Sequence, residues 1–386
     1  MQNPVNKFNY PLLATFLPTS ESQVIFLLNM KKRILVAMSG GVDSGTTAAL
    51  LKNEGHEVIG VTMQLWDYGD AEGGCCSADD VRDARRVADQ VGIPHYVVNY
   101  MDIFKKYIVE DFVGKYLSGK TPSPCVLCNQ FMKFNFLLRR ALELGADYLA
   151  TGHYARIETE EATGKFYLNK AVDSAKDQSY FLFTLTQNEL RRIMFPLGSM
   201  TKEEVREVAK SMNLKVADKP DSQEVCFITG GDYRDFLKEY ADNKRENGEI
   251  VDVEGNTLGY HDGIHSFTVG QRRGLRISKG KPMYVVRVEP ETNRVVVGEE
   301  KDIFRTGLVA NNITWADADR VASEEIEVKA KIRYRHREEV ALVKLQSDGE
   351  ALVEFRTPQR AMTPGQAIVF YKEDRVLGGG WINEVL

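Results

Sequence analysis

The sequence of 386 residues is poor in cysteine and proline, with five and twelve residues respectively, and it has no internal repeat. So few cysteines exclude a scaffold held by disulfide bonds, and the composition excludes a collagen-like chain. No apolar run reaches the length that a membrane-spanning helix needs. The formal net charge of −5 excludes a chain that is basic throughout, although it leaves room for local basic patches. After these exclusions, the sequence is expected to be a globular protein that is stabilised by hydrophobic cores.

The residues that are present are those of globular protein, with 43% hydrophobic and 27% charged. Such a chain buries enough apolar surface to offset the entropy of ordering, and its length indicates two or three domains. Residues 1–30 hold two short apolar bursts with Lys7 as their only base, which fits neither a signal peptide nor a mitochondrial presequence. We expect a loose extension there, with a start at Met30 as the alternative. The protein is then expected in the cytoplasm, where cysteines are reduced thiols, metal ligands or catalysts.

Short apolar strands alternate with amphipathic helices from residue 31 onward. The pattern predicts strands at residues 33–38, 57–63, 95–99 and 147–151, and helices at 43–52, 77–91, 131–144 and 201–212. This alternation predicts an α/β fold with a parallel, doubly wound sheet. Ligands of such sheets bind beyond the carboxyl ends of the strands, where Ser39-Gly-Gly and Thr151-Gly-His fall.

The second half of the chain changes character after about Asp221. Short apolar runs separated by turn residues lie at 283–288, 294–297, 325–334, 340–345, 351–355 and 367–371. Evenly spaced runs of this kind predict a small antiparallel barrel or sandwich, and we expect the barrel. The expected units are an extension (1–30), an α/β domain (31–222), a small central domain (223–300) and a C-terminal β-barrel (301–386).

The segment Ser39-Gly-Gly-Val-Asp-Ser44 follows a strand and opens a helix. Two glycines let the backbone approach an anion, and the first N–H groups of the helix can bind phosphate. We expect neither Gly40 nor Gly41 to tolerate a side chain, and Asp43 is a candidate Mg²⁺ ligand. The segment is not a Walker A loop, because Gly-Lys-Ser/Thr is missing. It resembles the pyrophosphatase loop (PP-loop) of enzymes that cleave ATP between its α and β phosphates, and an ordinary capped turn is the alternative.

Two cysteines, Cys125 and Cys128, form a Cys-x-x-Cys pair in a proline-rich, polar stretch, and Cys226 follows much later. Such a pair is a redox pair, half of a zinc site or part of a cluster site, and no second pair completes a zinc site. Buried, inert cysteine is the alternative. We favour that alternative, or a structural role at a helix start, for Cys75 and Cys76.

Two basic clusters are candidates for contact with nucleic acid. The residues Lys331, Arg333, Arg335 and Arg337 alternate, so on a strand all four would share one face. Either that face is merely solvated, or its four cations contact phosphates. The second cluster, Gln271-Arg-Arg-Gly-Leu-Arg276, falls on a predicted turn.

Seven motifs, taken in order, make the chain similar to the tRNA-specific 2-thiouridylase family from about Lys31 to the C-terminus. They are Ser-Gly-Gly-Val-Asp-Ser, Pro-Cys-x-x-Cys-Asn, Ala-Thr-Gly-His-Tyr-Ala, Lys-Asp-Gln-Ser-Tyr, Asp-Ser-Gln-Glu-Val-Cys-Phe-Ile, Gly-Gln-Arg-Arg-Gly-Leu and Lys-Ile-Arg-Tyr-Arg. That family replaces the C2 oxygen of the wobble uridine with sulfur in tRNAs for Lys, Glu and Gln. The resemblance implies ATP and Mg²⁺ as cofactors. It implies the tRNA anticodon arm and a sulfur donor protein (a cysteine desulfurase or a sulfur-relay protein) as partners, with no membrane.

The resemblance also implies roles for individual residues. Its nucleotide contacts match Ala37, Met38, Ser39, Gly40, Gly41, Val42, Asp43, Ser44, Met63 and Gly152. Its catalytic pair matches Cys128 and Cys226, and its target-base loop matches Ser123, Pro124 and Cys125. Its tRNA contacts match His153, Lys176, Asp177, Gln178, Arg333, Tyr334 and Gln366. Many members carry Asp where this chain has Cys125, so an acid–base role does not carry over there, and residues 1–30 have no counterpart.

The implied chemistry is adenylation of the C2 oxygen, followed by sulfur transfer from a persulfide on Cys226 with Cys128 as its partner. In a second mechanism, Cys125, Cys128 and Cys226 ligate a [4Fe–4S] cluster with one open iron; the sequence favours it slightly less, because a cluster usually takes a fourth cysteine. Two other functions stay open. An ATP-dependent ligase for a small molecule needs no cysteines, and a non-catalytic RNA-binding protein releases no pyrophosphate.

Overall fold

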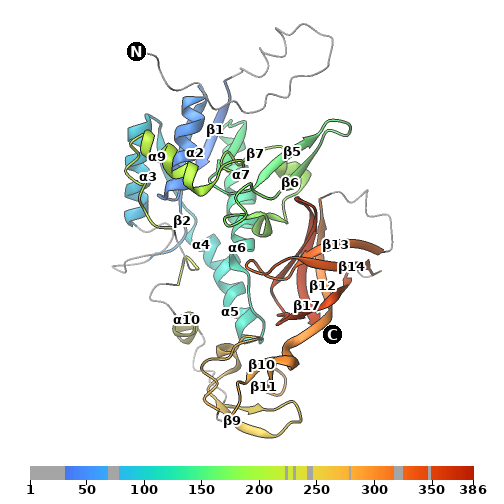
Figure 1. The fold of residues 1–386 in the computed structure, drawn as a ribbon. Coiled ribbons are helices and arrows are strands. Elements are labelled where there is room, and N and C mark those ends of the chain that lie inside the picture. The colour runs from blue at the N-terminus through green and yellow to red at the C-terminus, as the bar shows by residue number, and fades with distance from the viewer. Residues whose placement is uncertain are drawn as a thin grey trace.

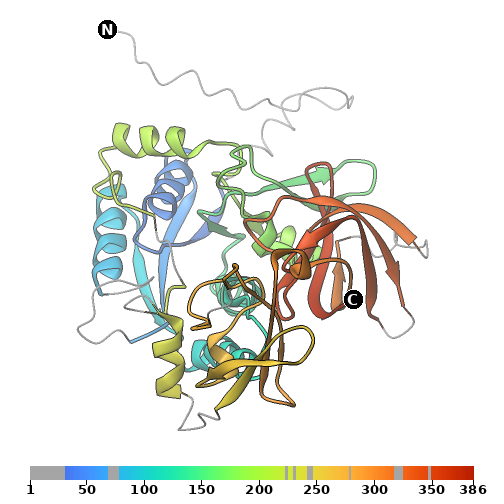
Figure 2. The same cartoon turned by 60° about the horizontal axis from the view of Figure 1, so that its bottom comes forward.

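The computed structural model describes residues 31–67, 78–221, 225–228, 232–240, 247–277, 280–316, 325–346 and 349–386. These residues form three sheets, a parallel one, a small central one and a barrel, which Figures 1 and 2 show as three units around the central helices. The predicted extension and the pair Cys75 and Cys76 lie outside the described residues. No helix in these ranges is long and apolar enough to cross a membrane.

The first sheet is parallel throughout, in the order β3-β2-β1-β4-β7. Its strands are β1 (Arg33–Ala37), β2 (Glu57–Gln64), β3 (His95–Asn99), β4 (Tyr148–Thr151) and β7 (Ile193–Met194). Alternate residues of β1 enter different cores: Ile34 and Val36 enter one, and Leu35 enters the other. The sheet is therefore covered on both faces, and the predicted doubly wound α/β fold is confirmed.

Helices from different parts of the chain cover the two faces of this sheet (Figure 1). One face carries α2 (Val42–Asn53), α3 (Ala78–Val91) and α9 (Lys202–Ser211). The other carries α4 (Met101–Phe104), a π-helical segment at Lys105–Val109, α5 (Glu110–Leu117), α6 (Pro124–Leu127), a second π-helical segment at Cys128–Leu137 and α7 (Leu138–Glu143). Shorter helices are Ser179–Leu182, a 3₁₀ turn, and α8 (Gln187–Leu190).

The helix predicted over 131–144 begins earlier than the sequence pattern indicated, at Pro124. Proline is well tolerated at the first position of a helix, because its missing N–H would have no partner there. The Cys-x-x-Cys pair consequently lies on the first turns of a helical run rather than in a loop.

The central sheet has the order β10-β11-β8-β9, with β11 and β8 parallel and the other pairs antiparallel. Its strands are β8 (Gly248–Val251), β9 (Thr257–His261), β10 (Tyr284–Glu289) and β11 (Arg294–Gly298), with a 3₁₀ turn at Ile264–Ser266. The preceding helix α10 (Tyr233–Tyr240) packs against the α/β domain and not against the central sheet. Its Leu237 and the earlier Phe227 are buried in the core of the α/β domain. That core therefore extends past residue 222.

The C-terminal unit is an antiparallel barrel in the order β12-β15-β14-β13-β16-β17, closed by pairing of β12 with β17. Its strands are β12 (Phe304–Trp315), β13 (Glu325–Lys331), β14 (Glu339–Leu345), β15 (Ala351–Arg360), β16 (Ala367–Lys372) and β17 (Arg375–Val385), after a 3₁₀ turn at Glu300–Ile303. The hairpin β5 (Arg156–Glu160) and β6 (Lys165–Asn169) of the α/β domain joins the edge of β17. The expected C-terminal β-barrel is confirmed.

The expected strand over 325–334 is wrong beyond Lys331. Pairing of Ala330 with Glu339 sets the register of β13 and β14, so residues 332–338 must form the connecting turn. Within it, the backbone N–H of His336 donates to the carbonyl of Arg333 at 3.0 Å. Lys331, Arg333, Arg335 and Arg337 therefore do not form a stripe on one strand face, because a turn does not alternate its side chains as a strand does.

Candidate functional site

The Ser39–Ser44 loop lies at the carboxyl end of β1 and opens α2, as the sequence predicted. The Ser44 hydroxyl accepts from the Ser39 N–H at 3.1 Å and donates to the Gly41 carbonyl at 3.2 Å, which holds the loop closed on itself. The two glycines differ. Gly40 has a φ of +73°, and a Cβ there would overlap the backbone of Asp80. Gly41 has extended backbone, and its Cβ would meet only the Ser39 hydroxyl at 3.6 Å.

A side chain at either glycine is expected to collide with the phosphates or to strain the backbone, and the structure gives the backbone ground at Gly40 only. The fold itself requires glycine at Gly40, whereas a side chain at Gly41 fits the protein and would meet only what occupies the loop. Gly152 is a third tight point, because a Cβ there would lie 2.8 Å from the backbone of Asp43 and Ser44. This contact sets the end of β4 directly against the first turn of α2.

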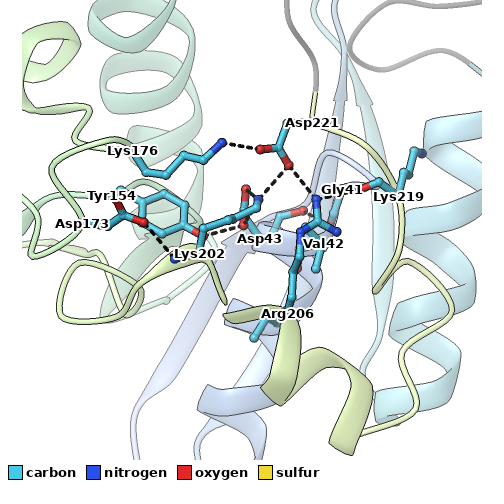
Figure 3. A network of polar contacts seen from close by, with 12 residues as sticks. Gly41, Val42, Asp43, Tyr154, Asp173, Lys176, Lys202, Arg206, Lys219 and Asp221 are labelled. Carbon is cyan, nitrogen blue, oxygen red and sulfur yellow. Dashed lines mark hydrogen bonds and ion pairs between the residues drawn. The ribbon is translucent and has the colours of Figure 1, made fainter. Parts of the chain in front are cut away.

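Beside the loop, Lys202 joins two carboxylates from distant parts of the chain (Figure 3). Its ammonium lies 2.7 and 2.8 Å from the two oxygens of Asp43 and 2.8 Å from Asp221, and only 11% of its side chain is exposed. The Tyr154 hydroxyl also donates to Asp43, at 2.8 Å. Burial, followed by the charge of Asp43, raises the pKa of Tyr154, so this hydroxyl stays protonated.

The Asp221 carboxylate forms ion pairs with three cations. Lys176 lies 2.6 Å from it, Lys202 2.8 Å and Arg206 3.2 Å (Figure 3). Burial alone would raise the pKa of Asp221, but the hydrogen bonds from Lys176 and Lys202 outweigh burial and lower the pKa. The carboxylate is thus held charged next to the loop.

Lys219 contacts the Ser39–Ser44 loop at Gly40. Its ammonium donates to the Gly40 carbonyl at 3.1 Å, to Asp80 at 2.8 Å and to Asp83 at 2.7 Å. The loop is therefore flanked by cations that carboxylates now neutralise. An arriving polyphosphate can take over those cations, because it carries more negative charge than a single carboxylate.

No pattern in the sequence singles out Lys202, Lys219 or Tyr154. Asp221 is the first residue of the motif Asp-Ser-Gln-Glu-Val-Cys-Phe-Ile. Thr201 caps the helix that carries Lys202, and the Thr201 hydroxyl accepts a hydrogen bond from the Glu204 N–H at 3.2 Å. Neither signal marks a contact with Asp43, because Lys202 and Asp43 lie 159 positions apart in sequence.

The cysteines lie on the other side of the sheet from α2. Cys125 is exposed on α6, whereas Cys128 and Cys226 are partly buried and pack against the same hydrophobic core. Ser123 and Pro124, which precede the pair, are buried. The two residues expected to work together thus share one core, although 98 positions separate them in the numbering.

Among the residues expected to contact tRNA, two are interior. His153 is buried between the Thr151 hydroxyl at 2.5 Å and the Lys133 ammonium at 3.3 Å. Burial, then the charge of Lys133, holds the pKa of His153 well below its ordinary value, so the ring is neutral. Asp177 is buried and accepts from the N–H groups of Ala171 and Ser179.

The other expected tRNA contacts lie where the barrel meets the α/β domain. Tyr334, on the β13–β14 turn, packs against Phe181 with ring centroids 4.4 Å apart. The Gln366 amide donates to the carbonyls of Thr121 and Pro122, at 3.2 and 2.7 Å. Three further residues use side-chain groups inside the protein: Lys176 pairs with Asp221, Gln178 accepts from the Tyr154 N–H, and Arg333 donates to the carbonyls of Arg360 and Ala361.

Comparison with known families divides the chain into three matched parts. Residues 32–230 match the tRNA methyl transferase HUP domain, residues 234–299 the tRNA methyl transferase PRC-barrel domain, and residues 305–382 the aminomethyltransferase beta-barrel domain. A tRNA-specific 2-thiouridylase MnmA from Geobacter metallireducens is 53% identical over 363 residues, covering 92% of this chain and 98% of the relative. The chain belongs to the tRNA-specific 2-thiouridylase family. The resemblance indicated by the motifs is thereby confirmed.

A second 2-thiouridylase, from Carboxydothermus hydrogenoformans, is 50% identical and covers 92% of this chain and 99% of its own length. Among solved structures, a 4-thiouridine synthetase in complex with RNA and ATP has a TM-score of 0.35 at 16% identity, covering 55% of this chain and 51% of that one. Membership of the 2-thiouridylase family rests on the sequence matches.

Proposed function

We propose that this protein replaces the C2 oxygen of the wobble uridine in tRNAs for Lys, Glu and Gln with sulfur, at the expense of ATP, in the cytoplasm. The observation that carries the proposal is the pairing of an anion-binding loop with partly buried cysteines in one domain of a 2-thiouridylase family member. The loop supplies a place for ATP, and the cysteines supply a sulfur carrier. A methyl transferase, which the family descriptions name, would need neither.

The first step is activation of the base. ATP would lie on the Ser39–Ser44 loop, with Lys202 and Lys219 released from their carboxylates to contact its phosphates. Mg²⁺ binds through one or two carboxylates together with phosphate oxygens, and Asp43 and Asp221 would be those carboxylates. The C2 oxygen of uracil attacks the α-phosphorus, and the bond to the β-phosphate oxygen breaks. Pyrophosphate leaves, and the oxygen becomes part of an AMP ester that can depart.

The second step is sulfur transfer. The terminal sulfur of a Cys226 persulfide attacks C2, and the Cys128 thiolate attacks the Cys226 sulfur, so that the persulfide S–S bond breaks as a Cys128–Cys226 disulfide forms. AMP leaves with the former C2 oxygen, and C2 retains the sulfur. A thiol reductant then returns the pair to thiols, and a sulfur donor protein reloads Cys226.

The cluster mechanism requires Cys125, Cys128 and Cys226 to converge on iron. Within the part of the chain that the structure describes, no group of three or more Cys, His, Asp or Glu side chains is placed to hold a metal ion. We propose the persulfide route because a cluster usually takes a fourth cysteine, and in that route Cys125 lies next to the target base without reacting.

The tRNA would be held through exposed arginines. Arg272, Arg273 and Arg276 of the central domain and Arg335 and Arg337 of the β13–β14 turn are exposed, and no carboxylate among the described residues pairs with them. Counterion release from tRNA phosphates favours binding to such cations. Their positions at the central domain and at the barrel suit an anticodon arm that contacts both.

Mass spectrometry of tRNA nucleosides tests the function directly. A strain lacking this protein should lose 2-thiouridine derivatives, and wild type should restore them. Cys128→Ala and Cys226→Ala should not restore them, whereas Cys125→Ala should retain some activity and serves as the matched control. A small-molecule ligase would survive all three changes, and an RNA-binding protein without catalysis would release no pyrophosphate when tRNA is added. Thiolated tRNA persisting in the deletion strain would refute the proposal.

A further inference from the structure

A cavity of about 630 Å³ lies between the helical run of the α/β domain and the barrel. Its helical wall includes Tyr107, Leu127 and Phe131, and its barrel wall includes Asn312 of β12 and Trp381 of β17. No residue to which the motifs gave a role lines it, although Leu127 directly precedes Cys128. Its lining combines aromatic rings, amides and lysines.

Aromatic rings line both walls. Tyr107 and Phe131 have their ring centroids 5.2 Å apart on the helical side, and Trp381 faces from the barrel. The Lys115 ammonium lies over one face of the Trp381 ring, 4.4 Å from its centroid, so that face already holds a cation. Flat rings of this kind stack on nucleobases of any sequence.

Amide side chains line the barrel wall because of an irregularity in β12. The register between β12 and β17 shifts between Asn311 and Thr314, and Asn312 has a φ of +49° within that bulge. A bulge re-aims side chains, and asparagine tolerates this backbone conformation better than most residues. Asn311, Asn312 and Asn383 all line the cavity, and amides can donate to and accept from the edges of a base.

The cavity also carries an excess of positive charge. Lys106, Lys115 and Lys120 line it against one acid, Asp111, which pairs with Lys115 at 3.1 Å. Lys120 donates to the Asn383 amide oxygen at 3.4 Å. Lys106 is exposed, and in the described ranges no carboxylate pairs with it. Rings, amides and lysines together match the base, the base edge and the phosphate of a nucleotide.

The cavity adjoins the expected path of the substrate. Gly365 lines it, and the neighbouring Gln366 donates to the carbonyls of Thr121 and Pro122, immediately before the loop matched to the target base. We infer that this cavity binds a second, unstacked nucleotide of the tRNA anticodon loop while the target uridine is near the cysteines. The inference rests on the proposed function and adds a subsite to it.

Fluorescence anisotropy with an anticodon stem-loop RNA tests the subsite. Lys106→Glu should weaken binding about tenfold at low salt and lower the salt slope by about one. Asn312→Gly keeps the backbone conformation and removes the amide, so it should weaken binding about fivefold without changing the slope. Lys52→Glu, at the exposed end of α2, is the matched control and should bind as wild type does.

Three results separate the inference from the proposed function. If both cavity variants bind the stem-loop as wild type does while wild type thiolates it, the subsite is wrong and the function stands. If wild type does not thiolate the stem-loop, the function itself fails. Calorimetry with AMP distinguishes a free nucleotide: AMP binding that both variants lose while their RNA affinity is unchanged would overturn the RNA assignment.

Discussion

Alanine should destabilise the protein at Gly40 and leave its stability almost unchanged at Gly41. At Gly40, alanine would have to adopt a left-handed φ of +73°, which costs about 1–2 kcal/mol, and would also push against the Asp80 backbone. We expect Gly40→Ala to lose about 2–3 kcal/mol of unfolding free energy in total, which lowers the thermal midpoint by about 5–10 °C for a domain of this size. At Gly41, the backbone is extended and the nearest atom to a Cβ is 3.6 Å away, so alanine or valine should change stability by less than about 1 kcal/mol.

At Gly41, a large side chain should affect activity and not stability. Gly41→Val should fold normally but lose ATP–pyrophosphate turnover, because its side chain points to where the phosphates bind. Calorimetric melting and ATP–pyrophosphate exchange, measured on both variants and on Gly41→Ala, check this. Undiminished exchange in Gly41→Val would show that ATP does not occupy the loop. Equal melting temperatures for the alanine variants at the two positions would contradict the backbone argument.

Five further substitutions have outcomes that can be measured. Lys202→Met removes a nearly buried ammonium from two carboxylates and should cost about 2 kcal/mol in urea unfolding, less than for a fully buried pair because the carboxylates are partly exposed; an unchanged midpoint would contradict this. Arg333→Ala should mainly destabilise the barrel, by about 1–3 kcal/mol, because it leaves two carbonyls without a donor. Arg335→Ala should instead leave stability unchanged and lower the salt slope of tRNA binding by about one; identical behaviour of the two arginine variants would argue against this division. The pKa of His153 is lower in the folded protein than in the unfolded chain, so stability is complete above about pH 6.5 and falls by about 1.4 kcal/mol per pH unit below it. His153→Gln should flatten that fall in urea titrations between pH 7.5 and 5.5, and a slope equal to that of wild type would count against it. Cys125→Ala protein should be as colourless after aerobic purification as wild type, and a brown wild-type protein whose colour is lost in this variant would favour the cluster.

Local pattern was enough to predict four of the five strands of the parallel sheet, and only the two-residue strand β7 was missed. Buried strands of such sheets are short apolar runs, and the helices between them carry caps such as Thr201 with Glu204, whose bonds the structure contains. The loop at Ser39–Ser44 could be found for the same reason, since a turn between a strand and a helix is specified by neighbouring residues. Strand β17 was missed because Gly378, Gly379 and Gly380 interrupt it, and glycine disfavours strands locally. Its place in the barrel makes those glycines suitable: a Cβ at Gly379 would lie 2.7 Å from the Phe183 ring.

From the sequence alone one can place most strands and helices of the α/β domain, the loop at Ser39–Ser44 and the family that the chain resembles, because each of these depends on neighbours in the chain. Which charged side chains meet depends on the tertiary fold. It paired Lys202 with Asp43 and Asp221, turned residues 332–338 out of the expected strand, and brought Trp381 of the barrel opposite Tyr107 of the α/β domain. Contacts of this kind join residues far apart in sequence, and their geometry follows from sheet register and domain packing, which no local pattern records.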